Sequence, residues 1–298
     1  MNGTNSTNEM KASTSTVWHE PDGGRHEAPP STSPLPSGDP GAHLGLDDQR
    51  GVPFTRLVHV ELRKLVDTIA GRWVVGAILL IASLAMAAMW LFADAETLGF
   101  EAFLGAAGLP VMLLLPILGI LAATTEWTKR TGLVTFTLEP RRIRVAFAKL
   151  VAALLLGVVT LGAAALVAAV MTVVAGALHE GAGSWDVEGR TLVGQLVNGL
   201  LGVAQGVGFG MLLGSTPLAL VAYFVLPQVL SLLHLWDKAA GVMPWIDLNA
   251  ASVMVDSGLR DGQPLTGTDW AHIASTYGVW VVAPIVLGTW MLLRREVK

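Results

Sequence analysis

The chain has 298 residues, of which 52% are hydrophobic and 14% are charged, and its formal net charge is −4. Soluble domains carry roughly 25% charged residues, so the composition excludes an ordinary soluble protein. Cysteine is absent, which excludes disulfide bridges and cysteine-ligated metal sites. Several uncharged stretches are long enough to cross a hydrocarbon core about 30 Å thick. We therefore expect an all-α, polytopic membrane protein.

Residues 1–50 differ from the remainder of the chain. They are rich in Ser, Thr, Pro, Gly and His and show no apolar periodicity. Such a composition buries too little apolar surface to offset the entropy lost on ordering. We expect residues 1–50 to form a disordered cytoplasmic tail, and residues 51–298 to form one six-span transmembrane domain.

Residues 54–71 precede the first long apolar stretch and have the pattern of an amphipathic helix. Basic side chains of Arg56, Arg63 and Lys64 lie away from its apolar face. A basic amphipathic helix next to a membrane span is typical of a helix that lies in the interface plane. A surface helix of a soluble domain is the alternative. The apolar face consists of Leu57, Val58, Leu62, Leu65, Val66 and Ile69.

Six stretches have the length and hydropathy of transmembrane helices. The second contains Pro110 and Pro116, which membrane helices tolerate with a kink. Spans four and five should form a tight hairpin, and a short helix is expected at residues 246–255 in the long connection before span six. The six predicted spans are residues 73–92, 102–123, 150–178, 192–213, 217–236 and 273–293.

The distribution of Lys and Arg predicts the orientation of these spans. Fourteen basic residues flank one side, at residues 50–72, 129–149 and 294–298, whereas the opposite connections hold only Arg190, Lys238 and Arg260. Basic flanks are typical of the cytoplasmic side. We therefore expect a multi-pass protein of the cell membrane with both termini in the cytoplasm. We expect no nucleic-acid partner.

The connection between spans two and three contains a second short helical pattern. Glu126 and Arg130 are spaced i,i+4 and can pair on a helix, which Gly132 can end. Pro140 breaks the following stretch. A short cytoplasmic helix and a turn are therefore expected here. The alternative is a basic loop that serves only as a topology signal.

This region resembles the coupling segment of ABC-2 type ABC transporter permeases, the membrane subunits of ABC exporters. Residues 61–73 also resemble the amphipathic helix that precedes the first span in that family. The chain departs from the pattern at Arg141, where a small hydroxyl residue is more usual. The residues that match are Glu126, Thr131, Thr135, Thr137, Leu138, Pro140, Arg142 and Lys149.

The resemblance implies a dimer of permeases, formed by two copies or by related chains, that is driven by a separate ATP-binding subunit. It also implies that the cytoplasmic helix between spans two and three couples the permease to that ATPase. The chain itself lacks a phosphate-binding loop, because none of its six lysines follows a glycine. We expect no bound cofactor. The expected coupling residues are Glu126, Trp127, Lys129, Arg130, Thr131 and Arg142.

Span four carries small or amide residues at every fourth position. Small residues at this spacing let helices approach closely, and an amide can hydrogen-bond across the contact. Plain helix packing is one interpretation, and a helix that rocks against a neighbour during transport is the other. The series consists of Gly194, Asn198, Gly202, Gly206, Gly210 and Gly214.

The sequence also bears on two further function classes. An intramembrane enzyme would need a nucleophile with a base, or paired carboxylates, inside the spans. Ser231 and His234 are present near the end of span five, but we expect no acid partner for them, and hence no enzyme. No charged residue is expected in the interior of a span, which disfavours a proton-coupled transporter. A structural or anchoring membrane protein without an ATPase remains the alternative to the permease.

Overall fold

The computed structural model describes residues 52–128, 141–259 and 262–294, and six helical segments in this part of the chain are long and apolar enough to cross a membrane. The predicted all-α, six-span architecture is therefore confirmed, and the chain is a multi-pass membrane protein. The spanning helices are α2 (Ile69–Phe92), α3 (Phe100–Thr128), α5 (Arg142–Leu178), α6 (Gly189–Leu213), α7 (Thr216–Ser231, continued by a turn to Leu235), and α10 (Gly267–Tyr277) joined to α11 (Ala283–Arg294).

Span three is longer than its apolar stretch predicts. Helix α5 begins at Arg142, whereas hydropathy placed the start of the span at Leu150. Arg142, Arg144 and Lys149, which the sequence analysis places in the connection before span three, therefore lie in the first turns of α5. A helix can continue beyond the hydrocarbon core into water, where polar side chains are solvated. Hydropathy detects only the part of the helix inside the core.

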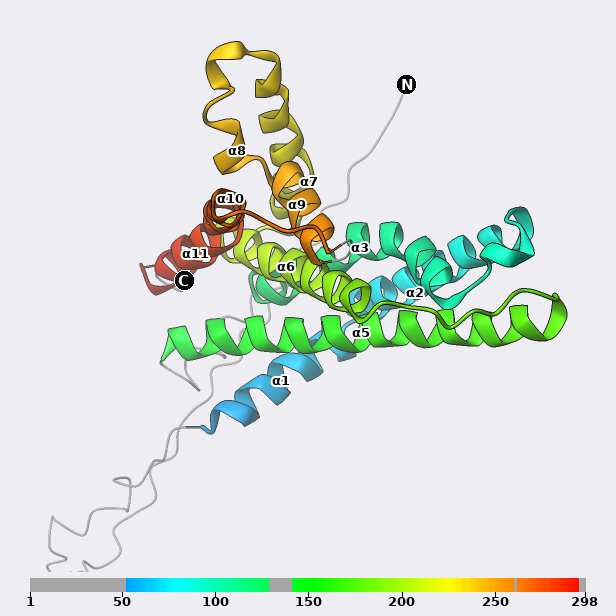
Figure 1. Cartoon of the computed structure of the whole chain (residues 1–298). Helices are drawn as coiled ribbons and strands as arrows, with labels where there is room; N and C mark the ends of the chain where they lie inside the picture. The colour runs from blue at the N-terminus through cyan, green and yellow to red at the C-terminus, as the bar shows by residue number, and fades with distance from the viewer. Residues whose placement is uncertain (1–51, 129–140, 260–261, 295–298) are drawn as a thin grey trace, which may run out of the picture. The chain divides into compact units, whose positions relative to one another are not determined.

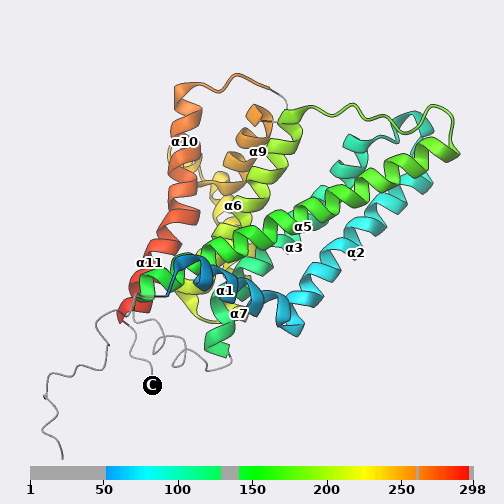
Figure 2. The same ribbon diagram turned by 90° about the horizontal axis from the view of Figure 1, so that it is seen from below.

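A short helix, α1 (Phe54–Asp67), precedes the first span and crosses one end of the helical bundle (Figure 2). It ends earlier than the sequence pattern predicts, because Thr68 is extended and its Oγ1 accepts a hydrogen bond from the N–H of Gly71 at 3.1 Å. This contact begins α2 in a new direction. Val58 and Leu65 on the apolar face of α1 are buried, and α1 packs mainly on α5.

Helices α3, α5 and α6 form the centre of the bundle, and α3 and α6 approach very closely. A Cβ atom added at Gly206 would collide with the carbonyl oxygen of Pro116, and one at Gly210 would lie 2.7 Å from the Cβ of Ala123. Gly202 faces the same proline ring, with a Cβ at 3.2 Å from its Cγ. The structure thus places this part of the small-residue series against α3.

The ends of that series have other environments. Gly194 is buried and Asn198 is half-buried on the same helix. Gly214 lies just after α6 and has a φ of 62°, so it ends the helix in the left-handed conformation that glycine adopts most readily. Helix α7 starts two residues later, as expected for a tight hairpin. The hydroxyls of Thr124 on α3 and Thr216 at the start of α7 lie 2.7 Å apart, so this contact joins α3 to α7.

The segment that connects α7 to α8 (Met243–Ile246) projects from the bundle (Figure 1), whereas α7 packs on α6 and α3 and α8 packs on α10. Only 11% of the most apolar window of span five is buried, against 56% in span two. Helix α9 (Leu248–Leu259) returns to pack on α6 and α10, and it corresponds to the short helix predicted at residues 246–255. Span five therefore exposes most of its apolar surface.

We predict that Gly206→Ala destabilises the protein by about 1–3 kcal/mol, because the added methyl group forces α3 and α6 apart. The measurement is the thermal unfolding midpoint in mild detergent. Gly76→Ala is the matched control, since a Cβ atom at Gly76 meets nothing within 4 Å, and its midpoint should stay the same or rise slightly. Equal midpoints for the two variants would contradict the close α3–α6 contact.

Candidate functional site

Four charged side chains from three helices meet at the end of the bundle that α1 crosses. Lys64 Nζ lies 2.7 Å from Glu61 Oε1 and 2.8 Å from Glu126 Oε1. Lys149 Nζ lies 2.8 Å from Glu61 Oε2 and 3.1 Å from Glu126 Oε1. Each lysine thus contacts both carboxylates, and we call these four residues the ion-pair cluster. It joins α1 to the end of α3 and the beginning of α5.

Three members of the ion-pair cluster are almost completely buried. The side chains of Glu61, Glu126 and Lys149 are 8%, 7% and 6% exposed, whereas that of Lys64 is 38% exposed. The two positive and two negative charges balance. Burying a charge costs several kcal/mol unless an opposite charge and hydrogen bonds compensate it, so each member depends on the others.

The contacts of Lys64 also fix its protonation. Burial alone would lower the pKa of Lys64, but the hydrogen bonds that it donates to Glu126 and Glu61, together with their charges, hold that pKa above its usual value. The lysine is therefore charged at physiological pH.

The sequence around each member explains its position. Glu61 occupies the buried face of α1, three residues after Val58 and four before Leu65, so helical spacing points it inward with them. Glu126 lies in the last turn of α3. Lys149 lies two turns inside α5, since that helix starts at Arg142.

Two arginines near the start of α5 hold other parts of the chain. Arg142 Nη1 donates to the carbonyl of Leu292 near the end of α11 at 2.9 Å, and Arg144 Nη2 donates to the carbonyl of Val52 before α1 at 2.7 Å. These bonds satisfy carbonyl groups at a helix end and in a connecting segment. The first turns of α5 therefore contact both the segment that begins α1 and the end of the last span.

The structure describes only some of the predicted coupling residues. Glu126 directs its carboxylate to two lysines of its own chain, and Arg142 contacts Leu292. Trp127 follows in α3. Lys129, Arg130 and Thr131, and the coupling helix expected between α3 and α5, lie outside the described residues.

The sequence interpretation missed the pairing of Glu61, Lys64 and Lys149 with Glu126. One signal was available. Glu61 interrupts the apolar face of an amphipathic helix, and a carboxylate on such a face requires a buried cation. The partner could not be named from sequence, since Lys149 lies 88 residues away.

A second polar cluster joins the end of span five to α9. His234 Nε2 lies 2.6 Å from Asp247 Oδ2, and Ser231 Oγ donates to Asp247 Oδ1 at 3.2 Å. The expectation that Ser231 and His234 have no acid partner was therefore wrong. Asp247 nevertheless stands between them, whereas a serine nucleophile needs the base at its own hydroxyl. The arrangement does not match a catalytic triad.

Asp247 instead stabilises the beginning of α9. Its Oδ1 accepts hydrogen bonds from the N–H groups of Asn249 at 2.9 Å and Ala250 at 3.4 Å, as an N-terminal helix cap does. Burial alone would raise the pKa of Asp247, but the hydrogen bonds from His234, these N–H groups and Ser231 outweigh it and hold the pKa below its usual value. The cluster is a structural link between α7 and α9.

Comparison with known proteins gave no assignment: no protein-family model matches the chain, and no curated protein matches it. The functional evidence therefore consists of the membrane architecture, the ion-pair cluster and the sequence resemblance described above. Among these, the ion-pair cluster is the feature of the described residues that links the membrane spans to a segment on one face of the membrane.

We predict that Lys149→Met destabilises the protein by about 3–5 kcal/mol, because it leaves a buried carboxylate without its full complement of positive charge. The measurement is the unfolding midpoint in mild detergent. Adding Glu61→Gln in the same chain should recover part of the loss, since the double variant restores the charge balance.

Arg63→Met is the matched control for Lys149→Met. Arg63 pairs with Asp67 at 3.0 Å, but the two side chains are 75% and 63% exposed. Exposed pairs contribute less than about 1 kcal/mol, so this variant should change the midpoint little. A similar decrease in the unfolding midpoint for both variants would show that burial does not determine how much an ion pair stabilises the protein.

The lowered pKa of Asp247 predicts a specific acid dependence. A lowered pKa stabilises the fold above the unfolded-state value of about 4, and this contribution is lost as pH falls through the lower folded-state value. Asp247→Asn should therefore unfold at a lower temperature than the wild type at pH 7, and the difference should narrow as the pH falls below about 4. A difference that stays constant with pH would contradict the ionised cap.

Proposed function

We propose that this chain is the membrane-spanning permease subunit of an ABC-2 type ABC exporter. In this function it couples ATP hydrolysis on a separate ATP-binding subunit to the movement of a substrate across the cell membrane. A second permease, identical or related, completes the transporter. The proposal rests on the sequence resemblance, and the ion-pair cluster is the structural observation that supports it most.

A permease of this kind must pass movement from a cytoplasmic contact to its spans. Residues 129–140 connect α3 to α5, and the ion-pair cluster lies at the end of the first helix and near the start of the second. Because the contacts are buried and charged, separating the two helix ends would leave unpaired charges. A force on residues 129–140 is therefore expected to move α1, α3 and α5 together.

The packing of the spans supports transmission deeper into the membrane. Helix α6 lies so close to α3 at Gly206 that the two backbones touch. Interiors that are tightly packed transmit strain rather than absorb it. We therefore propose that α6 follows α3, which develops the interpretation of the small-residue series as a moving contact.

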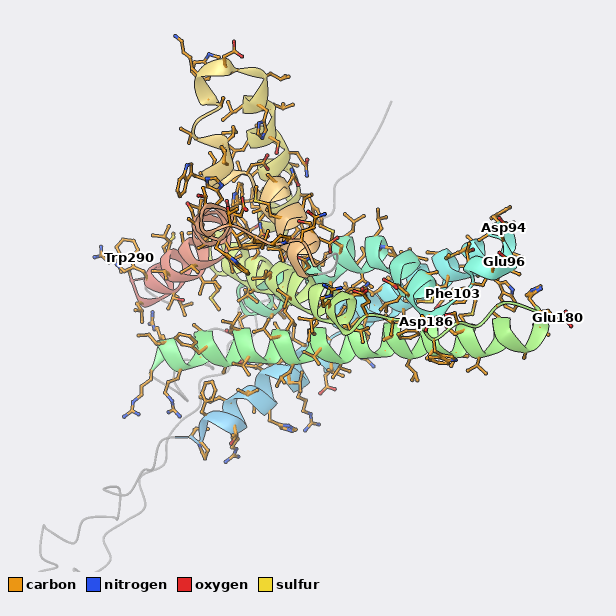
Figure 3. All side chains as sticks on the ribbon, in the orientation of Figure 1. Asp94, Glu96, Phe103, Glu180, Asp186 and Trp290 are labelled. Atoms are coloured by element: carbon orange, nitrogen blue, oxygen red, sulfur yellow. The ribbon has the colours of Figure 1, made fainter. Side chains whose placement is uncertain are left out.

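The arrangement of the chain also agrees with the proposed orientation. Helix α1, the start of α5 and the end of α11 lie at one end of the bundle, and the α5–α6 and α9–α10 connections lie at the other (Figure 2). The acidic residues Asp94, Glu96 and Glu180 lie near the ends of α2 and α5, and Asp186 lies in the connection from α5 to α6 (Figure 3). We propose that the basic end faces the cytoplasm. The exposed surface of α7 would then be available for lipid or for the second permease.

We predict that an ATP-binding subunit copurifies with the tagged protein in mild detergent, and that the double variant Lys129→Ala/Arg130→Ala loses it. The reason is that these two basic side chains are the expected docking contacts, and truncating them removes charge from an interface. The measurement is the amount of ATPase recovered per permease, with vanadate-sensitive ATP hydrolysis as a second readout.

Arg56→Ala/Arg63→Ala is the matched control, because it removes the same number of charges from exposed positions on α1. It should retain the ATPase. Unfolding midpoints of both variants show whether a loss reflects docking or folding. If no ATPase is recovered with the wild type, the permease assignment fails and the anchoring protein becomes the better explanation.

A further inference from the structure

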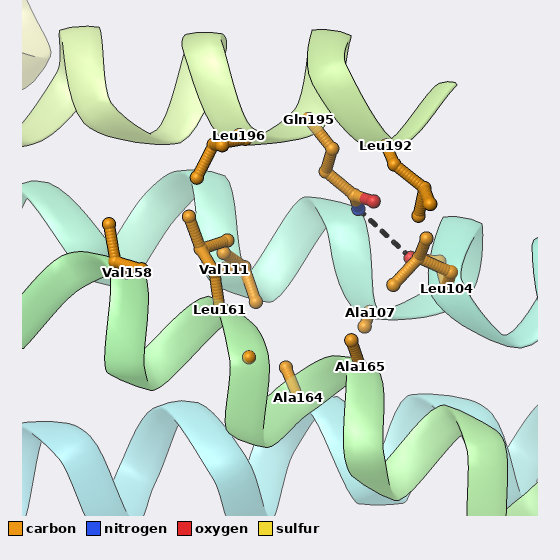
Figure 4. Close-up of a pocket in the computed structure, with 11 residues that line it drawn as sticks. Leu104, Ala107, Val111, Val158, Leu161, Ala164, Ala165, Leu192, Gln195 and Leu196 are labelled. Atoms are coloured by element: carbon orange, nitrogen blue, oxygen red, sulfur yellow. Dashed lines mark hydrogen bonds between the residues drawn. The ribbon is translucent and has the colours of Figure 1, made fainter. Parts of the chain in front are cut away.

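A pocket of about 210 Å³ lies between α3, α5 and α6 (Figure 4). Its walls are apolar except for one amide: Gln195 Nε2 donates a hydrogen bond to the carbonyl of Leu104 at 3.1 Å. Several of the lining residues on α3 and α5 are small. These small residues are Ala107, Gly162, Ala164 and Ala165.

The pocket lies in the half of the membrane opposite the ion-pair cluster. Its residues on α3 and α6 come from the first three turns of those helices, whereas Glu126 and Gly210 are near their other ends. Its residues on α5, between Val158 and Ala165, lie near the middle of that helix. Val158, Leu192 and Leu196 line the pocket and are also 43%, 40% and 39% exposed. In a bilayer these exposed side chains meet lipid, so the pocket opens sideways into hydrocarbon.

This pocket is unfavourable both for a water molecule and as an empty cavity. A buried water molecule needs two to four polar partners, and here the single amide donor is already bonded to Leu104. An empty pocket forfeits the dispersion contacts of its lining. Apolar cavities of about 150 Å³ are known to bind small apolar molecules such as benzene, so this larger pocket has room for a hydrocarbon segment.

Polar groups are present where a lipid head group would lie. Glu101 precedes Leu104 by one turn of α3, and its Oε1 accepts a hydrogen bond from Thr191 Oγ1 at 3.1 Å. Arg190 and Glu188 form an exposed ion pair at the start of α6, with Nη2 and Oε2 2.6 Å apart. Arg190 and Glu188 are paired with each other, and charges of both signs thus lie one turn outside the pocket, at the level where the phosphate and amine of a phospholipid would lie.

We propose that this pocket holds one acyl chain of a zwitterionic phospholipid from the leaflet opposite the ion-pair cluster. The bound chain fills the hollow between α3, α5 and α6 and completes their packing. The site is independent of ATP coupling and exists whether or not the chain is a permease. It identifies a lipid-binding site on the side of the central helices, not a path across the membrane.

Gly162 provides the means to test this. A Cβ atom added there meets nothing within 4 Å, so a larger side chain can enter the pocket without moving the backbone. Gly76 on α2 has equally open surroundings and lies outside the pocket. Gly162→Leu should therefore fill the site, and Gly76→Leu is its matched control.

The full chain would be reconstituted in vesicles of phosphatidylethanolamine and phosphatidylglycerol, with a trace of phosphatidylethanolamine that carries a diazirine on one acyl chain. After irradiation, mass spectrometry maps the labelled residues. We expect label to concentrate on the pocket lining, above the level at apolar residues of α2 that are more exposed than the lining. Gly162→Leu should reduce the pocket label to the α2 level, and Gly76→Leu should leave it unchanged.

Two outcomes would overturn the proposal. The first is wild-type label that is no greater in the pocket than at Leu80, Leu84 and Leu91 of α2, which are 60%, 59% and 78% exposed. The second is pocket label that Gly162→Leu does not reduce. The labelling pattern of the wild type tests the first outcome even if Gly162→Leu folds poorly. Gly162→Val, which adds a smaller side chain to the pocket, then tests the second outcome.

Discussion

Two buried carboxylates and two lysines impose the constraint on which the remainder of the structure depends. Glu61 and Glu126 can be accommodated away from water only while Lys64 and Lys149 neutralise them. This requirement brings α1, the end of α3 and the first turns of α5 to one place. Without it, a basic amphipathic helix such as α1 could lie anywhere on the membrane surface.

The helices of the bundle associate through complementary packing and not through the hydrophobic effect. In a membrane, lipid tails are as apolar as leucine side chains, so helices associate through close packing and hydrogen bonds. The contact at Gly206 supplies such packing for α3 and α6. Span two is 56% buried in its most apolar window, whereas spans one and five are 17% and 11% buried. The centre is thus well packed, and the outer spans remain available to lipid or to another subunit.

The spans could be predicted from the sequence because the hydropathy of a long uncharged stretch depends only on its own consecutive residues and not on the tertiary structure. The start of α5 at Arg142 could not, because a polar helix end outside the hydrocarbon has no hydropathy signal. The pairing of Lys149 with Glu61 and Glu126, and that of Asp247 with His234, could not be predicted either. Such pairing depends on which helices become neighbours in the fold. Glu126 was identified as important, but its surroundings place it inside the protein rather than at its surface.

The proposed coupling requires the ion-pair cluster to lie on the cytoplasmic side, where an ATPase would dock. The chain contains no cysteine, so single cysteines can report this directly. We predict that a membrane-impermeant maleimide labels Asp186→Cys and Gly241→Cys in intact cells, and labels Thr55→Cys on α1 only after the cells are permeabilised. Labelling of Thr55→Cys in intact cells would place the cluster outside and contradict the proposed coupling.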